Sequence, residues 1–305
     1  MVIRSFAALA AALKASPPLC PAVAGADDAA TLEALAEALA QGLIRGAILA
    51  GDADRIAALL PPALAPHVSL HPAATAAEAA AGAVAAIRAG AADVLVKGSV
   101  DSAAYLRAVV ARETGLRASD VLSNVTLAEM PSVPRLIGAT DNGIVVLPTL
   151  AQKRAILANA VPLFRGLGVQ PLRVAAIAAS EKLHPGQPAT TDAAALRDEA
   201  AAGDSTLLVD GPFGYDVALS PAAAAKKGFA ASPVAGQADL ILFPSIEAGN
   251  ATVKAWKLHG QARTASIVLG ARVPVLLNSR ADGAEQRRLG LLLAAAVRAG
   301  QEGGA

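Results

Sequence analysis

The chain has 305 residues, of which 54% are hydrophobic, 3% aromatic and 17% charged, and its net charge at pH 7 is +1. A charge near zero argues against a broad nucleic-acid surface, which needs a basic stripe, and no run of about 18 apolar residues indicates a membrane span. Alanine supplies much of the hydrophobic content, so the mean hydropathy of +0.48 is typical of a helix-rich, compact protein, which we expect in the cytoplasm.

The first residues predict a short amphipathic helix, because Phe6, Leu9 and Leu13 share one face at helical spacing. One basic residue before an apolar run also resembles a weak secretory signal, but Lys14 interrupts that run. The single cysteine, Cys20, excludes an internal disulfide. We expect it in the first strand, as a small buried side chain.

Short apolar runs then alternate with helical patterns along most of the chain, which is typical of parallel βαβ units. Strands are predicted at residues 19–24, 46–50, 67–70, 93–96, 121–128, 135–137, 174–178, 206–209, 240–243, 265–269 and 275–277. Helices are predicted at residues 28–41, 74–88, 101–113, 150–166, 191–202, 246–260 and 284–298. Right-handed crossovers would place these helices on both faces of the sheet.

The alternation changes near residues 115–135, where a strand-like segment follows without a long helix before it. We therefore predict a first α/β domain from residues 1–120 and 275–305, and a second from residues 121–274.

The four histidines are scattered along the chain. His67 and His71 have the spacing of a helical metal site, but the residues around them favour a strand. We therefore predict no protein-bound metal.

Several predicted strands end in glycine, aspartate or serine, which would form one polar rim from several loops. The clearest case is Asn278-Ser279-Arg280, directly after the apolar run at residues 273–277. In α/β proteins ligands bind at the carboxyl ends of strands. A guanidinium suits phosphate or carboxylate, and a neighbouring hydroxyl can donate to an oxyanion. The alternative is a surface turn between strand and helix.

The loop Lys97-Gly98-Ser99 precedes a predicted helix that begins near Asp101. Its backbone amides could face an anion, and Gly98 would permit close approach. Alternatively, Gly98 marks an ordinary tight turn and Lys97 is a solvated surface residue.

Taken together, several segments resemble the phosphate acetyl/butyryltransferase family over about residues 19–300, and they are closer to its butyryltransferase branch. They include VKGS at 96–99, ATDNG at 139–143, VDGP at 209–212, IEAGN at 246–250 and LNSR at 277–280. The resemblance implies a two-domain fold like that of the isocitrate/isopropylmalate dehydrogenases, with mostly parallel sheets, a cleft between the domains and a homodimer. It also implies reversible acyl transfer between coenzyme A and inorganic phosphate, with coenzyme A as substrate and no tightly bound cofactor or metal.

By the same resemblance, Ser279 would bind the carbonyl oxygen or phosphate, and Arg280 would hold the phosphate. Arg107 matches an arginine that contacts phosphate or coenzyme A, and Lys97, Gly98 and Ser99 would bind phosphate or coenzyme A. Asn250, in the segment IEAGN, suits a ligand contact or, equally, a helix cap or dimer contact.

The residue that accepts the thiol proton stays open. Acetyltransferase-type members carry an aspartate seven positions after the serine, where this chain has Gln286. Asp282 is the preferred base because it lies nearer the strand end, although it also suits an N-cap. Glu285 is a second candidate, and a third hypothesis is capture of the thiolate without a base.

Two rivals follow from these residues. A dehydrogenase of the same superfamily would need an aspartate cluster for a divalent metal, and the segments above offer Ser-Arg and Lys-Gly instead. A catalytically inactive module that binds coenzyme A or acyl phosphate is kept open by Gln286. The length of the acyl chain cannot be inferred from these segments.

Overall fold

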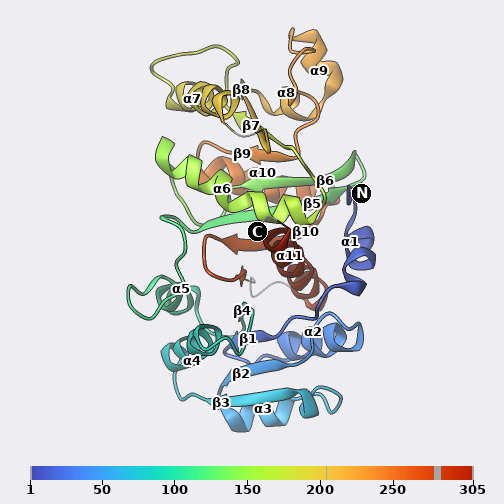
Figure 1. The fold of residues 1–305 in the computed structure, drawn as a ribbon, viewed down its shortest axis with the longest axis vertical. Coiled ribbons are helices and arrows are strands. Elements are labelled where there is room, and N and C mark those ends of the chain that lie inside the picture. Colours follow the sequence, from blue (N-terminus) through green and yellow to red (C-terminus); the bar gives the residue numbers. More distant parts are fainter. Residues whose placement is uncertain (1, 204, 278–282, 304–305) are drawn as a thin grey trace. The chain divides into compact units, whose positions relative to one another are not determined.

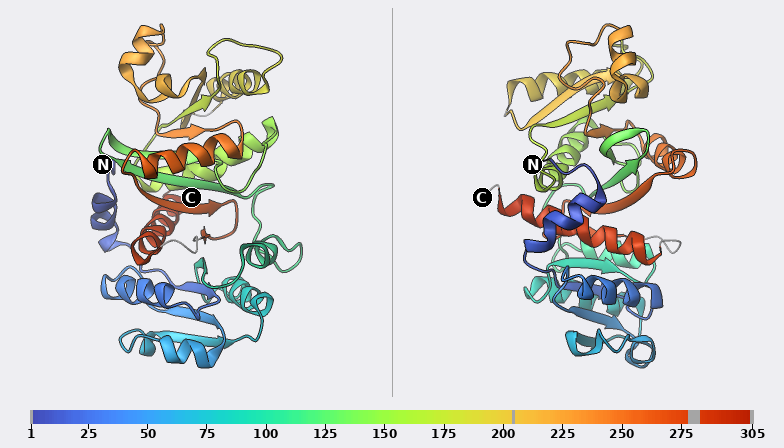
Figure 2. Two further views of the ribbon diagram at one scale, coloured as in Figure 1. Left: turned by 180° about the vertical axis from the view of Figure 1, so that it is seen from behind. Right: turned by 90° about the vertical axis from the view of Figure 1, so that its right-hand side faces the viewer.

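The computed structural model describes residues 2–203, 205–277 and 283–303. The chain divides into two compact units (Figures 1 and 2). Unit 1 comprises Met1–Phe6, Val121–Thr264 and Gly300–Ala305, and unit 2 comprises Ala7–Asp120 and Ala265–Ala299.

Unit 2 is built around a mostly parallel sheet in the order β3-β2-β1-β4-β11-β10. Its strands are β1 (Pro21–Ala24), β2 (Ala47–Gly51), β3 (Val68–Pro72), β4 (Val94–Lys97), β10 (Arg263–Leu269) and β11 (Val275–Leu276). Its helices are α1 (Phe6–Ala12), α2 (Ala29–Ala40), α3 (Ala53–Leu59), α4 (Ala76–Arg88), α5 (Ser102–Val110) and α11 (Ala284–Glu302). Short 3-10 turns lie at Leu13–Ala15 and Ala65–His67. The pair β10–β11 is antiparallel, and the other pairs in this unit are parallel.

Unit 1 contains the strand order β5-β6-β9-β7-β8. Its strands are β5 (Ser123–Met130), β6 (Val133–Thr140), β7 (Leu172–Ile177), β8 (Leu207–Phe213) and β9 (Leu240–Leu242). Its helices are α6 (Leu150–Gly166), α7 (Pro188–Ala202), α8 (Tyr215–Leu219), α9 (Pro221–Lys226) and α10 (Ile246–Leu258). Strands β6, β9, β7 and β8 are parallel, so their carboxyl ends meet at one edge.

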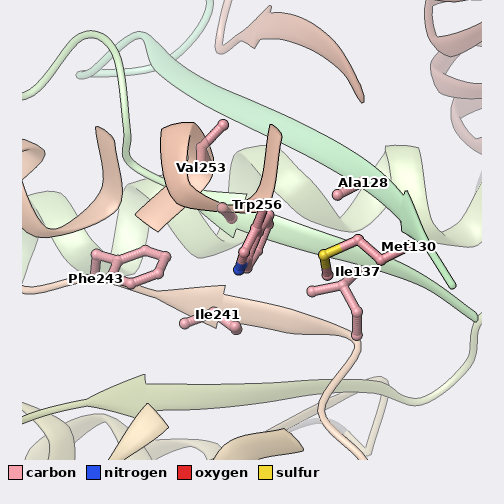
Figure 3. Packing of buried hydrophobic residues seen from close by; sticks show 8 residues of the cluster. Ala128, Met130, Ile137, Ile241, Phe243, Val253 and Trp256 are labelled. Atoms are coloured by element: carbon pink, nitrogen blue, oxygen red, sulfur yellow. The ribbon is translucent and has the colours of Figure 1, made fainter. Parts of the chain in front are cut away.

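The core of unit 1 shows why successive strand residues are both buried. Ile137 packs with Trp256 of α10 (Figure 3), whereas a Cβ on the next residue, Gly138, would meet Phe164 of α6 at 2.7 Å. Because neighbouring strand residues point to opposite faces, α10 and α6 cover opposite faces of this sheet. Both faces are therefore apolar, as in parallel sheets generally.

The predicted α/β class with a mostly parallel sheet is confirmed, and every predicted strand and helix has a counterpart. The expectation of parallel units almost throughout is wrong at two places, because β5–β6 and β10–β11 are antiparallel. Helices α3, α8 and α9 were not predicted.

The placement of Cys20 in the first strand is also wrong. Strand β1 begins at Pro21, and Cys20 is half-buried just before it, where its backbone N–H donates to Asp93 Oδ1 at 2.7 Å.

No helix within the described ranges has both the length and the apolar character needed to cross a membrane.

Candidate active site

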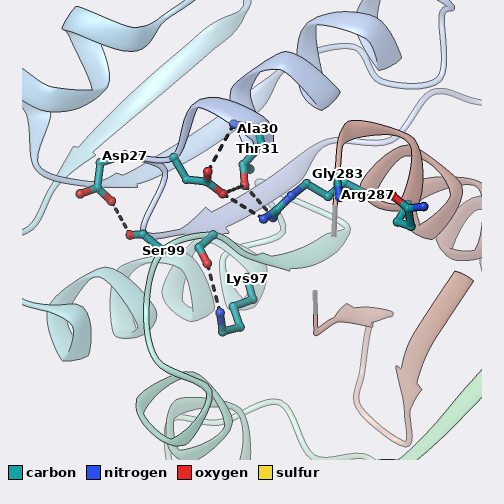
Figure 4. Close-up of polar contacts among 10 residues, drawn as sticks. Asp27, Ala30, Thr31, Lys97, Ser99, Gly283 and Arg287 are labelled. Carbon is teal, nitrogen blue, oxygen red and sulfur yellow. Dashed lines mark hydrogen bonds and ion pairs between the residues drawn. The ribbon is translucent and has the colours of Figure 1, made fainter. Parts of the chain in front are cut away.

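In unit 2, the strand ends meet at one edge because β1, β4 and β11 are parallel neighbours. The loops after β1 and β4 lie side by side there, with the first turn of α11 near them (Figure 4). The predicted catalytic residues Ser279, Arg280 and Asp282 follow β11 and lie outside the described residues. The described residues on either side of residues 278–282 are held by hydrogen bonds and an ion pair.

Lys97 is only 3% exposed, and its Nζ donates to the carbonyl of Gly98 at 3.2 Å. The alternative of a solvated surface lysine is therefore wrong. Ser99 Oγ donates to Asp27 Oδ1 at 2.5 Å, and Arg55 Nη1 lies 3.0 Å from Asp27 Oδ2. The hydroxyl of Ser99 thus joins the loop after β4 to the loop after β1.

The expectation that the amides of this loop face an anion is wrong. The N–H of Gly98 donates to Ala24 O at 2.9 Å, and that of Ser99 donates to Gly25 O at 2.7 Å. A Cβ at Gly98 would lie 1.9 Å from Gly25 O. Gly98 therefore allows two backbone segments to approach closely. The space between them holds neither a side chain nor a ligand atom.

The first turn of α11 is held by Arg287, which is 6% exposed. Its Nη1 donates to Thr31 Oγ1 at 2.8 Å, and its Nη2 lies 3.1 Å from Asp28 Oδ2. Asp28 also caps α2. Arg287 was missed in the sequence, although its spacing of four from the buried Leu291 placed it on the inner face of the helix.

Gln286, at the position where the family's aspartate was expected, accepts a hydrogen bond from the N–H of Gly283 at 3.2 Å through its Oε1. Its amide thus closes the start of α11. The alternative base Glu285 is exposed in the same turn.

On the other side of residues 278–282, Tyr105 anchors β11. Its side chain is fully buried, and its hydroxyl donates to Leu276 O at 3.1 Å. Burial raises the pKa of Tyr105 well above its usual value, so the hydroxyl stays a donor. Arg107 follows two residues later on α5 and is exposed. Tyr105 was not singled out in the sequence, where a lone aromatic residue in a helix indicates only core packing.

In unit 1, Asn250 lies on α10 and donates through Nδ2 to Asn142 O at 3.3 Å. A Cβ at the preceding Gly249 would lie 2.7 Å from Asp141 O. Asp141 is buried, and its Oδ1 accepts from the N–H of Ile144 at 2.8 Å. Burial raises the pKa of Asp141, although several backbone N–H groups oppose this. The segment IEAGN therefore packs against the segment TDN.

A large pocket of about 1300 Å³ opens at the carboxyl ends of β7, β8 and β9 in unit 1. The N-terminal ends of α6, α7 and α10 surround it, and most of its wall is apolar. Among its lining residues are Leu147, Pro148, Leu150, Ile177, Ala178, Phe243, Pro244, Ala248 and Ala251. A large pocket with a mostly apolar wall and a few polar groups suits a mostly apolar ligand.

The charges in this pocket are paired. Lys153 is buried and its Nζ lies 2.7 Å from Asp192 Oδ2. Lys227 Nζ lies 2.7 Å from Glu181 Oε1 and also contacts Asp216. The hydrogen bond to Lys227 lowers the pKa of Glu181. These three acids and two lysines leave a formal charge of −1, so the pocket does not concentrate anions.

The phenol ring of Tyr215 also lines this pocket. Its hydroxyl accepts a hydrogen bond from Trp256 Nε1 at 2.6 Å, and burial raises the pKa of Tyr215. The rim of the pocket is thereby joined to the core of unit 1. Across the described parts of the chain, no cluster of three or more histidine, cysteine, aspartate or glutamate side chains could hold a metal ion.

Comparison with known proteins gives consistent results. The family model described as phosphate acetyl/butaryl transferase matches residues 71–295. The probable phosphate butyryltransferase of Bacillus subtilis is 38% identical over 81% of this chain and 82% of its own length. The phosphate acetyltransferase of Thermotoga maritima is 36% identical over 70% of this chain and 72% of its own.

Among solved structures, a branched-chain phosphotransacylase from Enterococcus faecalis has a TM-score of 0.81 and 26% identity, and the match covers 92% of this chain and 99% of that one. Fold, sequence and the motifs at the strand ends agree, and we conclude that the chain belongs to the phosphate acetyl/butaryl transferase family.

Proposed function

We propose that this protein is an acyltransferase that reversibly transfers a short acyl group between coenzyme A and inorganic phosphate. The observation that carries this proposal is the 38% identity to a probable phosphate butyryltransferase over more than four fifths of both chains. The related phosphate acetyltransferase supports the same reaction with a shorter acyl group.

The reaction runs through attack of the coenzyme A thiolate on the carbonyl carbon of an acyl phosphate. A carbon–sulfur bond forms, and the carbonyl electron pair moves onto oxygen. When the tetrahedral intermediate collapses, the carbon–oxygen bond to phosphate breaks and phosphate leaves with that electron pair. The thiol proton goes to a base or to solvent. Donors to the oxyanion and to the phosphate are therefore the main catalytic requirement.

Ser279 and Arg280 are proposed for these two donors, and Asp282 for the base. Ser279 and Arg280 are supported by their match to the family motif, whereas Asp282 is supported only by its position near the strand end, because the family's aspartate position is Gln286 here. In the sequence all three fall between Leu276, which is bound by Tyr105, and Arg287 at the start of α11. Each proposed donor is worth about 10²–10³ in rate.

For the remaining proposed residues, the support differs. Arg107 is exposed, so an anion in solution can reach it, and its charge also acts on Asp101. Lys97 and Ser99 hold Gly98 O and Asp27 in the present structure, and their remaining donor or acceptor capacity is proposed for the substrate, while Gly98 acts through packing. Asn250 keeps its proposed ligand contact beside its bond to Asn142.

The pocket of unit 1 is proposed to take the pantetheine arm of acyl-CoA rather than its phosphates, because this arm is uncharged and mostly apolar and the pocket carries a formal charge of −1. Coenzyme A is thus a substrate rather than a resident cofactor. The isocitrate/isopropylmalate dehydrogenase-like fold is proposed on the two α/β units with mostly parallel sheets. The domain boundaries at residues 120 and 274, the homodimer and the cytoplasmic location stay predictions.

The test is release of free thiol from acetyl-, propionyl- and butyryl-CoA with and without phosphate. We expect phosphate-dependent release with at least one of the three. Purified protein that binds coenzyme A but releases no thiol with any of them would leave the inactive binding module as the better explanation. Cys20 adds little background, because burial, together with Asp93 and against Arg45, raises the pKa of its thiol.

Arg280→Ala tests the residue assignment. We expect turnover to fall at least about a hundredfold while the circular dichroism spectrum is unchanged. Arg288→Ala is the matched control, because the one hydrogen bond of the Arg288 side chain among the described residues is to Gln41, at 3.4 Å. Near-normal turnover of Arg280→Ala would remove this arginine from the mechanism.

A further inference from the structure

A second pocket, of about 390 Å³, lies at the opposite edge of the unit 1 sheet, where β6, β7 and β9 begin. The N-terminal segment of the chain closes one side of it. Its polar lining is Arg4, Arg135, Arg173, Gln170, Gln237 and Asp239. The reaction proposed above uses none of these residues.

The register of the sheet brings these side chains together. Val174 and Gly138 both pair with Leu240, so Arg173, Asp239 and Ile137 occupy one level on the same face. Arg135 lies two residues before Ile137 and therefore shares that face. The backbone N–H of Arg173 donates to Asp239 Oδ2 at 3.1 Å, and Arg173 Nη1 lies 3.7 Å from the same oxygen.

The guanidinium of Arg135 is fixed against the backbone. Its Nε and Nη2 donate to Ala238 O at 3.2 and 3.0 Å. The opposite edge of the guanidinium, Nη1, is left for another acceptor. Arg4 is exposed and makes no hydrogen bond or ion pair with any described residue.

Three guanidinium groups and one buried carboxylate thus line this pocket, which gives it a formal charge of +2. Burial lowers the pKa of Arg135, and repulsion by Arg4 and Arg173 adds to this against the attraction of Asp239. Like charges held this close are unfavourable unless an anion compensates them. A doubly negative ligand would neutralise the group.

We propose that this pocket is a binding site for a phosphate dianion, either inorganic phosphate or a small phosphate monoester. Arginine is the side chain best suited to phosphate, because its planar fork donates two parallel hydrogen bonds. The two glutamine amides add neutral donors. The volume lies near the lower end of the range for small-ligand pockets, about 300–1,000 Å³, which suits a small ester rather than coenzyme A.

The experiment is calorimetric titration of the full chain with inorganic phosphate and, separately, with glycerol 3-phosphate. Arg280→Ala serves as the background, because this variant weakens the phosphate site proposed for catalysis. We expect it to keep one site per chain. Adding Arg135→Gln should weaken that site at least about tenfold, since one of three charged donors is lost.

Arg4→Gln gives a second measurement that does not disturb packing, because Arg4 is exposed. Arg154→Gln is the matched control, as Arg154 is an exposed arginine paired with Glu199 elsewhere in unit 1. Tighter binding of inorganic phosphate would identify the substrate itself as ligand, and tighter binding of glycerol 3-phosphate a monoester.

The proposal is overturned if the Arg280→Ala protein binds neither inorganic phosphate nor glycerol 3-phosphate. It is also overturned if Arg135→Gln and Arg4→Gln, each added to Arg280→Ala, leave binding as tight as the control Arg154→Gln does in the same background. Thiol release by the single variants Arg135→Gln and Arg4→Gln should equal that of the unaltered chain. A negative result in the calorimetric titration can therefore be distinguished from a negative result in the thiol-release assay, which tests the acyltransferase reaction.

Discussion

Gly98→Ala separates two roles for the loop after β4. If Gly98 lets a ligand approach, alanine should weaken phosphate or coenzyme A binding and leave stability unchanged. If Gly98 serves backbone packing, alanine should destabilise the protein. No positive φ is involved, so the added methyl group acts only through its contacts.

The structure gives the size of the effect. The new Cβ would lie 1.9 Å from Gly25 O, whereas real Cβ atoms keep at least 3.0 Å, so the two segments must separate by about 1.1 Å. The bonds from Gly98 N to Ala24 O and from Ser99 N to Gly25 O would then stretch from 2.9 and 2.7 Å to about 4.0 and 3.8 Å. Gly98 is buried, so its N–H loses about 1–3 kcal/mol, and the exposed Ser99 loses about 0.5–1.5 kcal/mol. We expect a total loss of about 1.5–4.5 kcal/mol.

Urea unfolding followed by circular dichroism measures this loss. Gly283→Ala is the control, because among the described residues its Cβ would meet only the far end of Gln286, at 3.5 Å. An unfolding free energy for Gly98→Ala within about 0.5 kcal/mol of the unaltered chain would refute the packing argument. A raised KM for phosphate at unchanged stability would restore the ligand-binding role.

Tyr105→Phe should lower the unfolding free energy by about 1 kcal/mol, the usual net value of one buried hydrogen bond, which urea unfolding measures. It should also lower kcat for thiol release several-fold, because the end of β11 loses the hydrogen bond to Leu276. An unchanged kcat would contradict this effect on turnover. Asp192→Asn leaves the buried ammonium of Lys153 unpaired and should cost about 2–4 kcal/mol in thermal unfolding. The hydrogen bond to Lys227 lowers the pKa of Glu181 from its usual value of 4.5. Between the lowered pKa and pH 4.5 the folded state therefore binds fewer protons at Glu181 than the unfolded state, so stability falls as the pH drops below 4.5. Lys227→Met should make this fall shallower in melting temperatures measured from pH 7 to pH 3.

Two matched variants serve as controls for this group. Glu199→Gln breaks the exposed pair with Arg154 and should leave the unfolding free energy essentially unchanged, because solvent screens this pair. Lys226→Met removes an exposed neighbouring lysine and should leave the acid response as it is. Equal losses for Asp192→Asn and Glu199→Gln would mean that burial of Lys153 carries no cost.

Strands and long helices could be predicted because their signals are local. Val174–Ala178 and Leu240–Phe243 are apolar runs bounded by polar residues, and capping residues such as Thr149 mark helix starts. Helices α8 and α9 have only five and six residues, too short for a periodic pattern to stand out. The antiparallel pair β5–β6 had a usable signal in Pro131-Ser132, a two-residue link between two strand patterns.

Of the site, the residue types at strand ends could be predicted, but not their partners. The backbone N–H groups of Gly98 and Ser99 donate to the carbonyls of Ala24 and Gly25, more than seventy positions earlier in the sequence. The burial of Lys97 and the ion pair between Arg287 and Asp28 likewise form only when loops that are distant in the sequence come together. Contacts between residues so far apart in the sequence produce no repeating pattern from which they could be predicted.

The hydrogen bond between Trp256 and Tyr215 provides an optical probe. Trp256 is the single tryptophan of the chain, and the ring of Tyr215 belongs to the wall of the large pocket in unit 1. A ligand that enters the pocket and moves Tyr215 would change the polarity around the indole N–H, and with it the emission wavelength. Occupancy of the pocket can thus be followed by intrinsic fluorescence, without a label and without turnover.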